Sequence, residues 1–426
     1  MTLLLTAYRA VMAAFHPFAS QVMAGRLRAG KERPERLPER FGRATAARPV
    51  GDLIWLHAAS VGEMRLLLDL FGGLREQCGD VRAVITTQTL TSADLVAKLA
   101  PPGLIHQMAP VDTPQSMGRF LNYWRPSALV LAEGEIWPGM LTEIRKRGIP
   151  SALVNARMTQ SSLRGWMRVG RSARELLSSF TFIGAADDTT RKGLETLAGT
   201  RISVCGNLKQ AVRSKPAAAE RIQDLRTALK KRPVCLAAST HPGEEAFALT
   251  AFSHVRKQRP DALLIIAPRH PERGDDILSL ARSFGFTSRR RTADPAHPDP
   301  ELDVLIADTL GEMPLWFAVS DGVFLGGATA DDVGGHNAME PAALGRRVLT
   351  GPNGFNFVDM FRDLRVINAL EIASLPEELS AFWLREIGAP PLEQEGVERL
   401  LQTAQEARSE TLSALCDLMS GARRHA

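Results

Sequence analysis

Acidic residues closely follow two apolar runs in the first half of the chain. Glu63 lies three residues after Ser60, and Glu133 and Glu135 come directly after the run 128–132. A carboxylate in such a place can take a proton from a substrate hydroxyl, and two neighbouring carboxylates can raise the pKa of one of them. A structural role is the alternative, because Ser60 and Glu63 have the spacing of a helix capping box, and acids also neutralise helix N-termini.

Two cations in the same half stand shortly after apolar runs. Arg157 ends the sequence VNAR, and Lys209 ends the sequence GNLK. Either side chain could bind a phosphate or a carboxylate. The alternative for each is a solvated surface charge.

Small residues, glycines and a cation follow the apolar runs of the second half. The turn ASTHPGEE could hold an anion with its backbone N–H groups, and Arg269 lies in the sequence APRHPE. Thr309 and Glu312 have capping-box spacing. Paired glycines, including those that open GGHNAMEP, let the backbone approach a ligand closely, and Glu340 in that sequence could bind ribose hydroxyls. Ordinary turns and caps are the alternative for all of these junctions.

Short apolar runs separate these junctions. They cover residues 53–57, 81–87, 104–109, 128–132, 151–155, 180–185, 202–205, 234–238, 263–267, 304–307, 322–325 and 347–350. Most are continuously apolar, as in strands buried on both faces, and the stretches between them can hold crossover helices. We therefore predict an α/β fold with two parallel, doubly wound sheets. Since ligands bind beyond the carboxyl ends of such strands, we expect a cleft between two Rossmann-like lobes. The first lobe would bind the acceptor and provide acid–base catalysis, and the second lobe would bind a nucleotide.

The chain of 426 residues is long enough for two domains. The polar, alanine-rich stretch 213–232 has prolines near its ends and predicts the boundary. We expect an N-terminal segment 1–35, an acceptor-binding domain 36–212, and a nucleotide-binding domain 213–426 that includes the terminal helices.

Two later stretches carry local signals. Residues 288–300 hold three arginines and three prolines and predict a surface loop. Residues 392–419 predict a helix with one exposed face.

Composition limits the partners. The net charge of +5 suits an anionic substrate or an anionic membrane surface. Aromatic residues make up 6% of the chain and do not interleave with a basic stripe, so we expect no nucleic acid. The four cysteines, Cys78, Cys205, Cys235 and Cys416, form no CxxC pair, which predicts neither a zinc site nor a disulfide framework and favours a reducing compartment.

The N-terminal segment is basic and partly apolar. Residues 1–31 contain no acid, and the uncharged stretch 10–25 is short and interrupted for a membrane span. It lacks a clear signal-peptide cleavage site. We expect it to lie in the membrane interface; the alternatives are a helix packed on the domain and a true span.

Several enzyme classes lack their motifs here. The sequence has no GxxxxGK[ST], no GxGxxG after the first strand and no HExxH. It also has no Asp-x-Asp triplet for Mg²⁺. We therefore expect no metal and no cofactor, so that helix N-termini and cations would meet the charge of a leaving group.

Taken together, the motifs resemble those of the 3-deoxy-D-manno-octulosonic acid (Kdo) transferases of lipid A and lipopolysaccharide biosynthesis. WLHAASVGE is similar to their WxHAxSxGE, AEGEIWPG to ETEIWPN, and NARMTQSS to NARLSxxS, while GNLK is the same. ASTHPGEE, APRHPER, DTLGEM, GGHNAMEPAALG and GPNGFNF follow in the family's order. The resemblance runs from about Arg36 to about Phe361.

The resemblance implies a GT-B fold and an inverting, metal-independent glycosyltransferase. Its donor would be CMP-Kdo and its acceptor a lipid A precursor (lipid IVA) at the cytoplasmic face of the bacterial inner membrane. Glu63 would be the general base, and Glu133 and Lys209 would stabilise the transition state. The implied CMP-binding residues are Pro268, Arg269, Gly311, Glu312, Met313, Asn337, Ala338, Met339 and Glu340. Further candidates for substrate contact are Ser60, Gly62, Arg157, Ser239, Thr240, Gly334, Gly335 and His336.

The chain departs from the family pattern at four positions. Gly134 replaces the middle Thr of ETE, Gly139 replaces the Asn after Trp-Pro, and Asp331 and Asp332 stand where the family tends to be apolar or neutral. A paralogue with another activated sugar or acceptor therefore stays an alternative. A non-catalytic binding protein with two Rossmann-like lobes is the alternative from another class.

Overall fold

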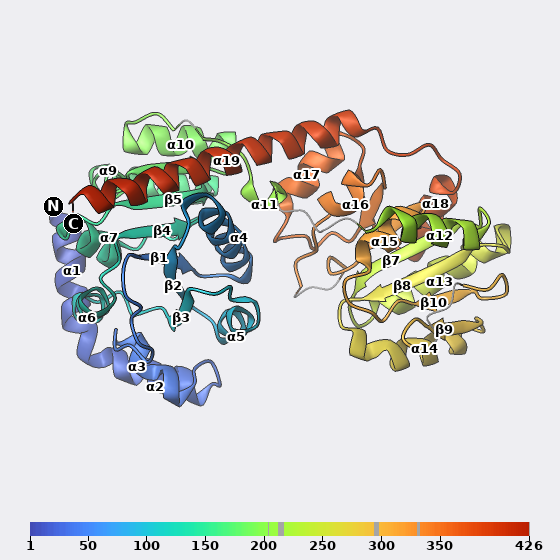
Figure 1. The fold of residues 1–426 in the computed structure, drawn as a ribbon, viewed down its shortest axis with the longest axis horizontal. Helices are drawn as coiled ribbons and strands as arrows, with labels where there is room; N and C mark the ends of the chain where they lie inside the picture. Colours follow the sequence, from blue (N-terminus) through green and yellow to red (C-terminus); the bar gives the residue numbers. More distant parts are fainter. Residues whose placement is uncertain (203, 212–216, 294–297, 330–332, 426) are drawn as a thin grey trace. The chain divides into compact units, whose positions relative to one another are not determined.

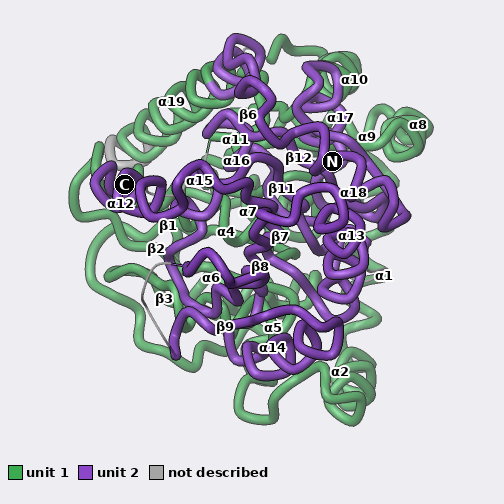
Figure 2. Tube along the Cα trace, turned by 90° about the vertical axis from the view of Figure 1, so that its right-hand side faces the viewer, with its two compact units in different colours: residues 1–212, 402–426 green, residues 213–401 purple. Residues whose placement is uncertain are grey.

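The computed structural model describes the whole chain except residues 203, 212–216, 294–297, 330–332 and 426 (Figure 1). Parts of the predicted boundary 213–232 and loop 288–300, and both Asp331 and Asp332, lie outside the described residues. The chain forms two compact units, one of residues 1–212 and 402–426 and one of residues 213–401 (Figure 2).

The first unit is built on a parallel sheet of six strands in the order β3-β2-β1-β4-β5-β6. The strands are β1 (Leu53–Ala58), β2 (Arg82–Thr87), β3 (Leu104–Met108), β4 (Ala128–Ala132), β5 (Ser151–Ala156) and β6 (Phe182–Ala185). Nearly all their side chains are buried because helices cover both faces of the sheet, which explains the continuous apolar runs. In the run 202–205, the described residues 202, 204 and 205 belong to no named strand; Cys205 makes an isolated bridge to Ala185.

Side-chain caps begin many of the crossover helices of this unit. The helices are α4 (Val61–Cys78), α5 (Leu90–Leu99), α6 (Pro114–Trp124), α7 (Pro138–Lys146), α8 (Gln160–Arg168), α9 (Gly170–Leu177), α10 (Asp188–Ala198) and α11 (Leu208–Ala211). Ser60, Thr89, Thr113, Thr159 and Asp187 each accept a hydrogen bond from a backbone N–H of the helix that follows. The strand order reverses between β1 and β4, so the carboxyl ends of these two strands form the crevice where such sheets bind ligands.

The N-terminal segment forms α1 (Leu3–Phe15), a 3₁₀ turn (His16–Phe18) and α2 (Ala19–Arg28), and it packs on the first unit. Tyr8 donates a hydrogen bond to Asp112 at 2.9 Å, and Arg9 pairs with Glu143 at 2.9 Å. Among the described helices, none has both the length and the apolar character needed to cross a membrane.

The second unit holds a parallel sheet of seven strands in the order β13-β12-β11-β7-β8-β10-β9. The strands are β7 (Val234–Thr240), β8 (Leu263–Pro268), β9 (Ser288–Arg290), β10 (Val304–Ile306), β11 (Gly322–Leu325), β12 (Val348–Thr350) and β13 (Leu370–Ile372). β9 lies in the stretch expected to be a loop, and no strand was expected at β13. The fold prediction of two parallel, doubly wound α/β sheets is confirmed.

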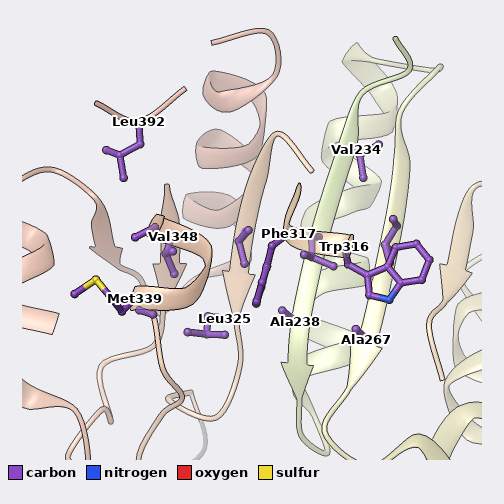
Figure 3. Close-up of a cluster of buried hydrophobic side chains, with 14 of the residues drawn as sticks. Val234, Ala238, Ala267, Trp316, Phe317, Leu325, Met339, Val348 and Leu392 are labelled. Carbon is purple, nitrogen blue, oxygen red and sulfur yellow. The ribbon is translucent and has the colours of Figure 1, made fainter. Parts of the chain in front are cut away.

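Helices cover this second sheet as well. They are α12 (Ala219–Leu229), α13 (Glu244–Gln258), α14 (Gly274–Ser283), α15 (Met313–Val319), α16 (Met339–Ala343), α17 (Val358–Val366) and α18 (Pro376–Glu386). Figure 3 shows part of the core, in which Trp316 and Phe317 of α15 belong to the same buried cluster as Ala238, Ala267 and Leu325 of the sheet. This packing fixes the start of α15 near the carboxyl ends of the strands.

The last helix, α19 (Gln394–His425), corrects the expected domain composition. Residues 402–426 belong to the first unit rather than the second. Leu412 and Leu415 share a buried cluster with α4, and Arg408 pairs with Asp69 of that helix at 2.8 Å. The later part of α19 therefore completes the first core, whereas Val397 and Leu401 at its start belong to the buried cluster of the second unit.

A disulfide also joins α19 to α4, contrary to the expectation from cysteine spacing. Cys78 and Cys416 are bonded, with their Cα atoms 6.4 Å apart and a sequence separation of 338. Sequence spacing did not reveal the pair because only the return of α19 brings the two residues together. Cys205 and Cys235 are thiols.

Candidate active site

Glu63 lies at the carboxyl end of β1, in the first turn of α4, and takes part in the N-terminal capping of this helix. Ser60 Oγ accepts from the Glu63 backbone N–H at 3.2 Å and donates to Glu63 Oε1 at 2.9 Å. The Ala59 N–H donates to Glu63 Oε2 at 2.7 Å. Glu63 therefore does take the helix-capping role that the sequence offered as the alternative to catalysis, and these bonds also hold its carboxylate in a fixed position.

The environment of Glu63 nevertheless strengthens it as a base. The residue is only 7% exposed. Burial raises the pKa of its carboxyl group, and the negative charges of Glu133 and Glu135 raise it further, while the bonds from Ala59 and Ser60 oppose the shift. The net result is a pKa above the ordinary value, which favours proton uptake from a bound hydroxyl.

Glu133 and Lys209 form an ion pair beside Glu63. Glu133 follows β4 with a left-handed backbone (φ 56°), and its Oε1 contacts Lys209 Nζ. A Cβ atom placed on Gly62 would lie 3.1 Å from Lys209 Nζ, so the ammonium group lies against the first turn of α4. The structure thus brings together the three predicted catalytic residues, which come from α4, the end of β4 and α11.

A second polar network, missed by the sequence analysis, lies under this site. His57 is fully buried, its Nδ1 lies 2.8 Å from Thr86 Oγ1, and its Nε2 lies 3.5 Å from Glu135. Trp137 Nε1 donates to Glu135 at 2.5 Å. Burial raises the pKa of Glu135, but the close contact with His57 and the hydrogen bond from Trp137 outweigh this effect and lower it overall. Glu135 therefore remains a fixed anion beside Glu63.

Other predicted substrate-contact residues of the first unit lie at the same sheet edge. Ser60 is exposed, Gly62 is half-buried, and Arg157 is half-buried just after β5. A Cβ on Gly134 would lie at an ordinary 3.6 Å from the Arg157 carbonyl oxygen, so the backbone does not require glycine there.

In the second unit, the carboxylate of Glu244 occupies much of the turn that was predicted to hold an anion. Glu244 accepts hydrogen bonds from the N–H groups of His241 at 2.9 Å and Gly327 at 2.7 Å. A Cβ on Gly326 would lie 2.3 Å from Glu244 Oε2, so the first glycine of the pair makes room for this carboxylate. A ligand at this edge must use other groups.

A histidine pair lies at the same edge. His241 Nε2 and His336 Nε2 are 2.9 Å apart, and the two rings lie within 15° of parallel, with centroids 5.2 Å apart. Burial lowers the pKa of His241. A Cβ on Gly327 would meet the His336 ring at 2.8 Å, so the second glycine makes room for this pair.

The predicted CMP-binding residues are distributed around the carboxyl ends of the second sheet. Pro268 ends β8 and Arg269 is exposed beyond it, while Gly311, Glu312 and Met313 lead into α15, and Asn337, Ala338, Met339 and Glu340 lead into α16. The side chains of Ala338 and Met339 are buried in the core, so a ligand could reach only their backbone.

Several other side chains of this set bond within the protein. Thr240 is buried and donates to Glu245 at 2.8 Å. Glu312 pairs with Arg221 and, at 3.4 Å, with Arg291. Ser239 is half-buried, and Gly334 and Gly335 have positive φ of 82° and 86°. Any nucleotide contact by Glu312 would have to replace or share these bonds.

The described residues contain no cluster of three or more His, Cys, Asp or Glu side chains that could hold a metal ion. That the reaction needs no metal stays a prediction.

Comparison with known proteins shows which family the chain is similar to. Residues 35–212 match the family described as 3-deoxy-D-manno-octulosonic-acid transferase. The chain is 32% identical over 390 residues to the 3-deoxy-D-manno-octulosonic acid transferase of Haemophilus influenzae, covering 90% of each protein. It is 35% identical over 365 residues to that of Bordetella pertussis, covering 83% of this chain and 84% of the relative.

A solved structure supports the fold alone. The MurG protein of Acinetobacter baumannii superposes with a TM-score of 0.53 at 12% identity, covering 85% of this chain and 99% of that one.

Proposed function

The chain belongs to the Kdo transferase family, and we propose that it transfers Kdo from CMP-Kdo to a hydroxyl of a lipid A precursor. It is a glycosyltransferase with two parallel α/β units. The arrangement of Glu63, Glu133 and Lys209 at the reversal point of the first sheet is the observation that carries the proposal.

Glu63 acts as the general base. Its carboxylate takes the proton of the acceptor hydroxyl while the hydroxyl oxygen bonds to the anomeric carbon of Kdo. The bond from that carbon to the phosphate oxygen of CMP breaks, and CMP leaves with the electron pair. This direct displacement inverts the anomeric centre. The raised pKa of Glu63 supports the role, since a stronger base takes the proton more readily.

Glu133 and Lys209 act as a fixed pair of charges. The ammonium group of Lys209 stabilises negative charge that develops on the reacting oxygens, and Glu133 holds the lysine in place. Because both groups are positioned before the substrate binds, little reorganisation is needed during the reaction.

The second unit binds the nucleotide. Arg269 is an exposed cation at its strand ends and would meet the phosphate. The backbone at Gly311–Met313 and Asn337–Glu340 would hold the base and ribose. That the two units share one cleft stays a prediction.

Transfer to a lipid acceptor would take place at a membrane surface, and we assign the membrane contact to the N-terminal segment 1–35. The segment leaves Val11, Phe18 and Val22 exposed, at 64%, 56% and 47%. The cytoplasmic face of the bacterial inner membrane, where CMP-Kdo would meet its acceptor, is the location we propose.

The experiment is Kdo transfer from CMP-Kdo, generated in place, to a tetraacylated lipid A precursor, with and without EDTA. We expect wild-type turnover that EDTA does not reduce, and its loss in Glu63→Ala with the fold intact by circular dichroism. Absence of wild-type transfer with a folded protein would redirect the proposal to another sugar or acceptor. Loss of transfer in EDTA, restored by Mg²⁺, would overturn the metal-independent mechanism.

A further inference from the structure

Asn155 is a buried polar residue at the carboxyl end of β5 with no role so far. It is 1% exposed and has a left-handed backbone, with φ of 51°. The pairing of β5 with β6 shifts register at this point, between Leu153 and Ala156. Asparagine tolerates this conformation better than most residues.

The two ends of the Asn155 amide bind two different parts of the candidate active site. Its Nδ2 lies 3.4 Å from Glu133 Oε1 and donates to it, and its Oδ1 accepts the Leu208 N–H at 2.9 Å. Leu208 is the first residue of α11, and the next residue, Lys209, contacts the same oxygen of Glu133. Asn155, Glu133, Lys209 and Leu208 therefore form a closed ring.

The segment that carries Lys209 needs such an anchor. Helix α11 has only four residues, too few for a stable helix without tertiary contacts. The lysine side chain is long and loses much rotational freedom when it is fixed. A buried hydrogen bond at the first residue of α11 holds the backbone under Lys209 at a set distance from Glu133.

We propose that Asn155 is a positioning residue, which acts through Glu133 and Leu208 to preset the ion pair of Glu133 and Lys209. An amide side chain is suited to the role because it offers a donor and an acceptor together. Aspartate has the same shape and keeps the acceptor for Leu208, but it loses the donor and places a negative charge beside Glu133. The proposal rests on the proposed function for its catalytic consequence.

The first test is kinetic and compares Asn155→Asp with wild type. We expect kcat to fall about 10- to 100-fold, the range for losing a hydrogen bond to a charged group, with the KM for CMP-Kdo little changed. The added carboxylate raises the pKa of neighbouring acids, so the acid limb of the kcat profile should move to higher pH. Asn122→Asp, the same change on the surface of α6, is the control and should move neither.

A double variant separates positioning from a general structural effect. On a Glu133→Gln background the Asn155→Asp change should cost much less than in wild type, because its partner is already neutral. An equal loss on both backgrounds, or an unchanged kcat and pH profile in the single variant, would overturn the proposal.

The second test needs no substrate and so does not depend on the proposed function. Hydrogen exchange of the Leu208 amide should be faster in Asn155→Ala, which lacks the acceptor, and protected in Asn155→Asp, which retains it. Equal protection in Asn155→Ala would show that the anchor does not exist. Failure of Kdo transfer by wild type, in contrast, would count against the proposed function while this exchange pattern still supported the anchor.

Discussion

At the scale of single residues, Glu63 serves two purposes at once. Its carboxylate accepts hydrogen bonds from Ala59 and Ser60 at the start of α4 and also faces the charges of Glu133 and Glu135. A residue that was only a cap would be replaceable by glutamine, which is also common at this position of a capping box. A base would not.

This distinction leads to the first prediction. Glu63→Gln should reduce turnover about 100- to 10,000-fold, the usual contribution of a general base, with a melting temperature close to that of wild type. Thr89→Ala removes the cap of α5 and should have the opposite pattern of effects. It should lower the stability by about 0.5–2 kcal/mol and leave turnover unchanged. Parallel assays of transfer and thermal unfolding test the pair, and wild-type turnover by Glu63→Gln would leave Glu63 as a cap only.

The second prediction concerns pH. The active form of Glu63 is the carboxylate, and its pKa is raised by burial and by nearby negative charges. Activity should therefore fall on acidification at a higher pH than for an ordinary glutamate. Glu135→Gln removes one of those charges, so it should lower the pKa of Glu63 and move the acid limb of the kcat/KM profile to lower pH. A limb that stays in place or moves upward would contradict the assignment.

The family departure at Gly139 has a local explanation. Asp112 accepts the N–H groups of Gly139 at 2.9 Å and Met140 at 2.6 Å, and so caps α7. A Cβ on Gly139 would lie 2.5 Å from this carboxylate. Glycine and Asp112 therefore belong together in this chain, and the departure reflects packing beneath α7.

At the scale of elements, sequence reasoning succeeded where strands are buried on both faces. β1, β4 and β8 read as continuous apolar runs because helices cover both sides of the sheet. The missed strands, β9 and β13, lie at the two edges of the second sheet and are short, with sequences SRR and LEI. An edge strand that is partly exposed does not need an apolar run, so its sequence carries no such signal.

The same limit applies to the site. Glu63, Glu133 and Lys209 could be picked from the sequence because each follows an apolar run and matches a family motif. The ring through Asn155 could not, because it depends on a contact between residues 53 positions apart, Asn155 and Leu208. The sequence also did not indicate which unit α19 packs against, because an apolar face does not specify which core it joins.

The third prediction tests this packing of α19. Leu412 of α19 is 1% exposed, and a Cβ on Gly73 of α4 would lie 2.8 Å from it, so the two helices pack closely. Leu412→Ala should cost about 2–5 kcal/mol, the range for such a buried truncation. Hydrogen exchange should become faster in β1 and β4 while β7 and β8 stay protected. Ser413→Ala, on the exposed face of α19, is the control, and equal loosening of both units would contradict the assignment of the later part of α19 to the first core.

At the scale of the whole molecule, the proposed lipid acceptor would require the protein to meet a membrane, and no described helix could cross one. The net charge is +5, and the first 31 residues contain no acid. Exposed apolar side chains on a basic helical segment can enter the headgroup region of an anionic bilayer. Phe18 and Val22 carry such side chains, and their exposure leaves them available for the interfacial contact that we propose.

The last prediction follows from this charge and exposure. The protein should co-sediment with vesicles containing phosphatidylglycerol more than with neutral vesicles, and added salt should weaken binding because it screens the basic residues. Changing Phe18 and Val22 together to serine should lower the partition coefficient about 100-fold or more, since full burial of each side chain is worth roughly 1.5–3 kcal/mol. Val366→Ser, at a site that is 78% exposed on α17 of the second unit, is the matched control and should bind as wild type. If the double variant binds like wild type, or if anionic vesicles have no advantage, then the N-terminal segment is a packed element of the first unit and the lipid acceptor must be reached by another surface.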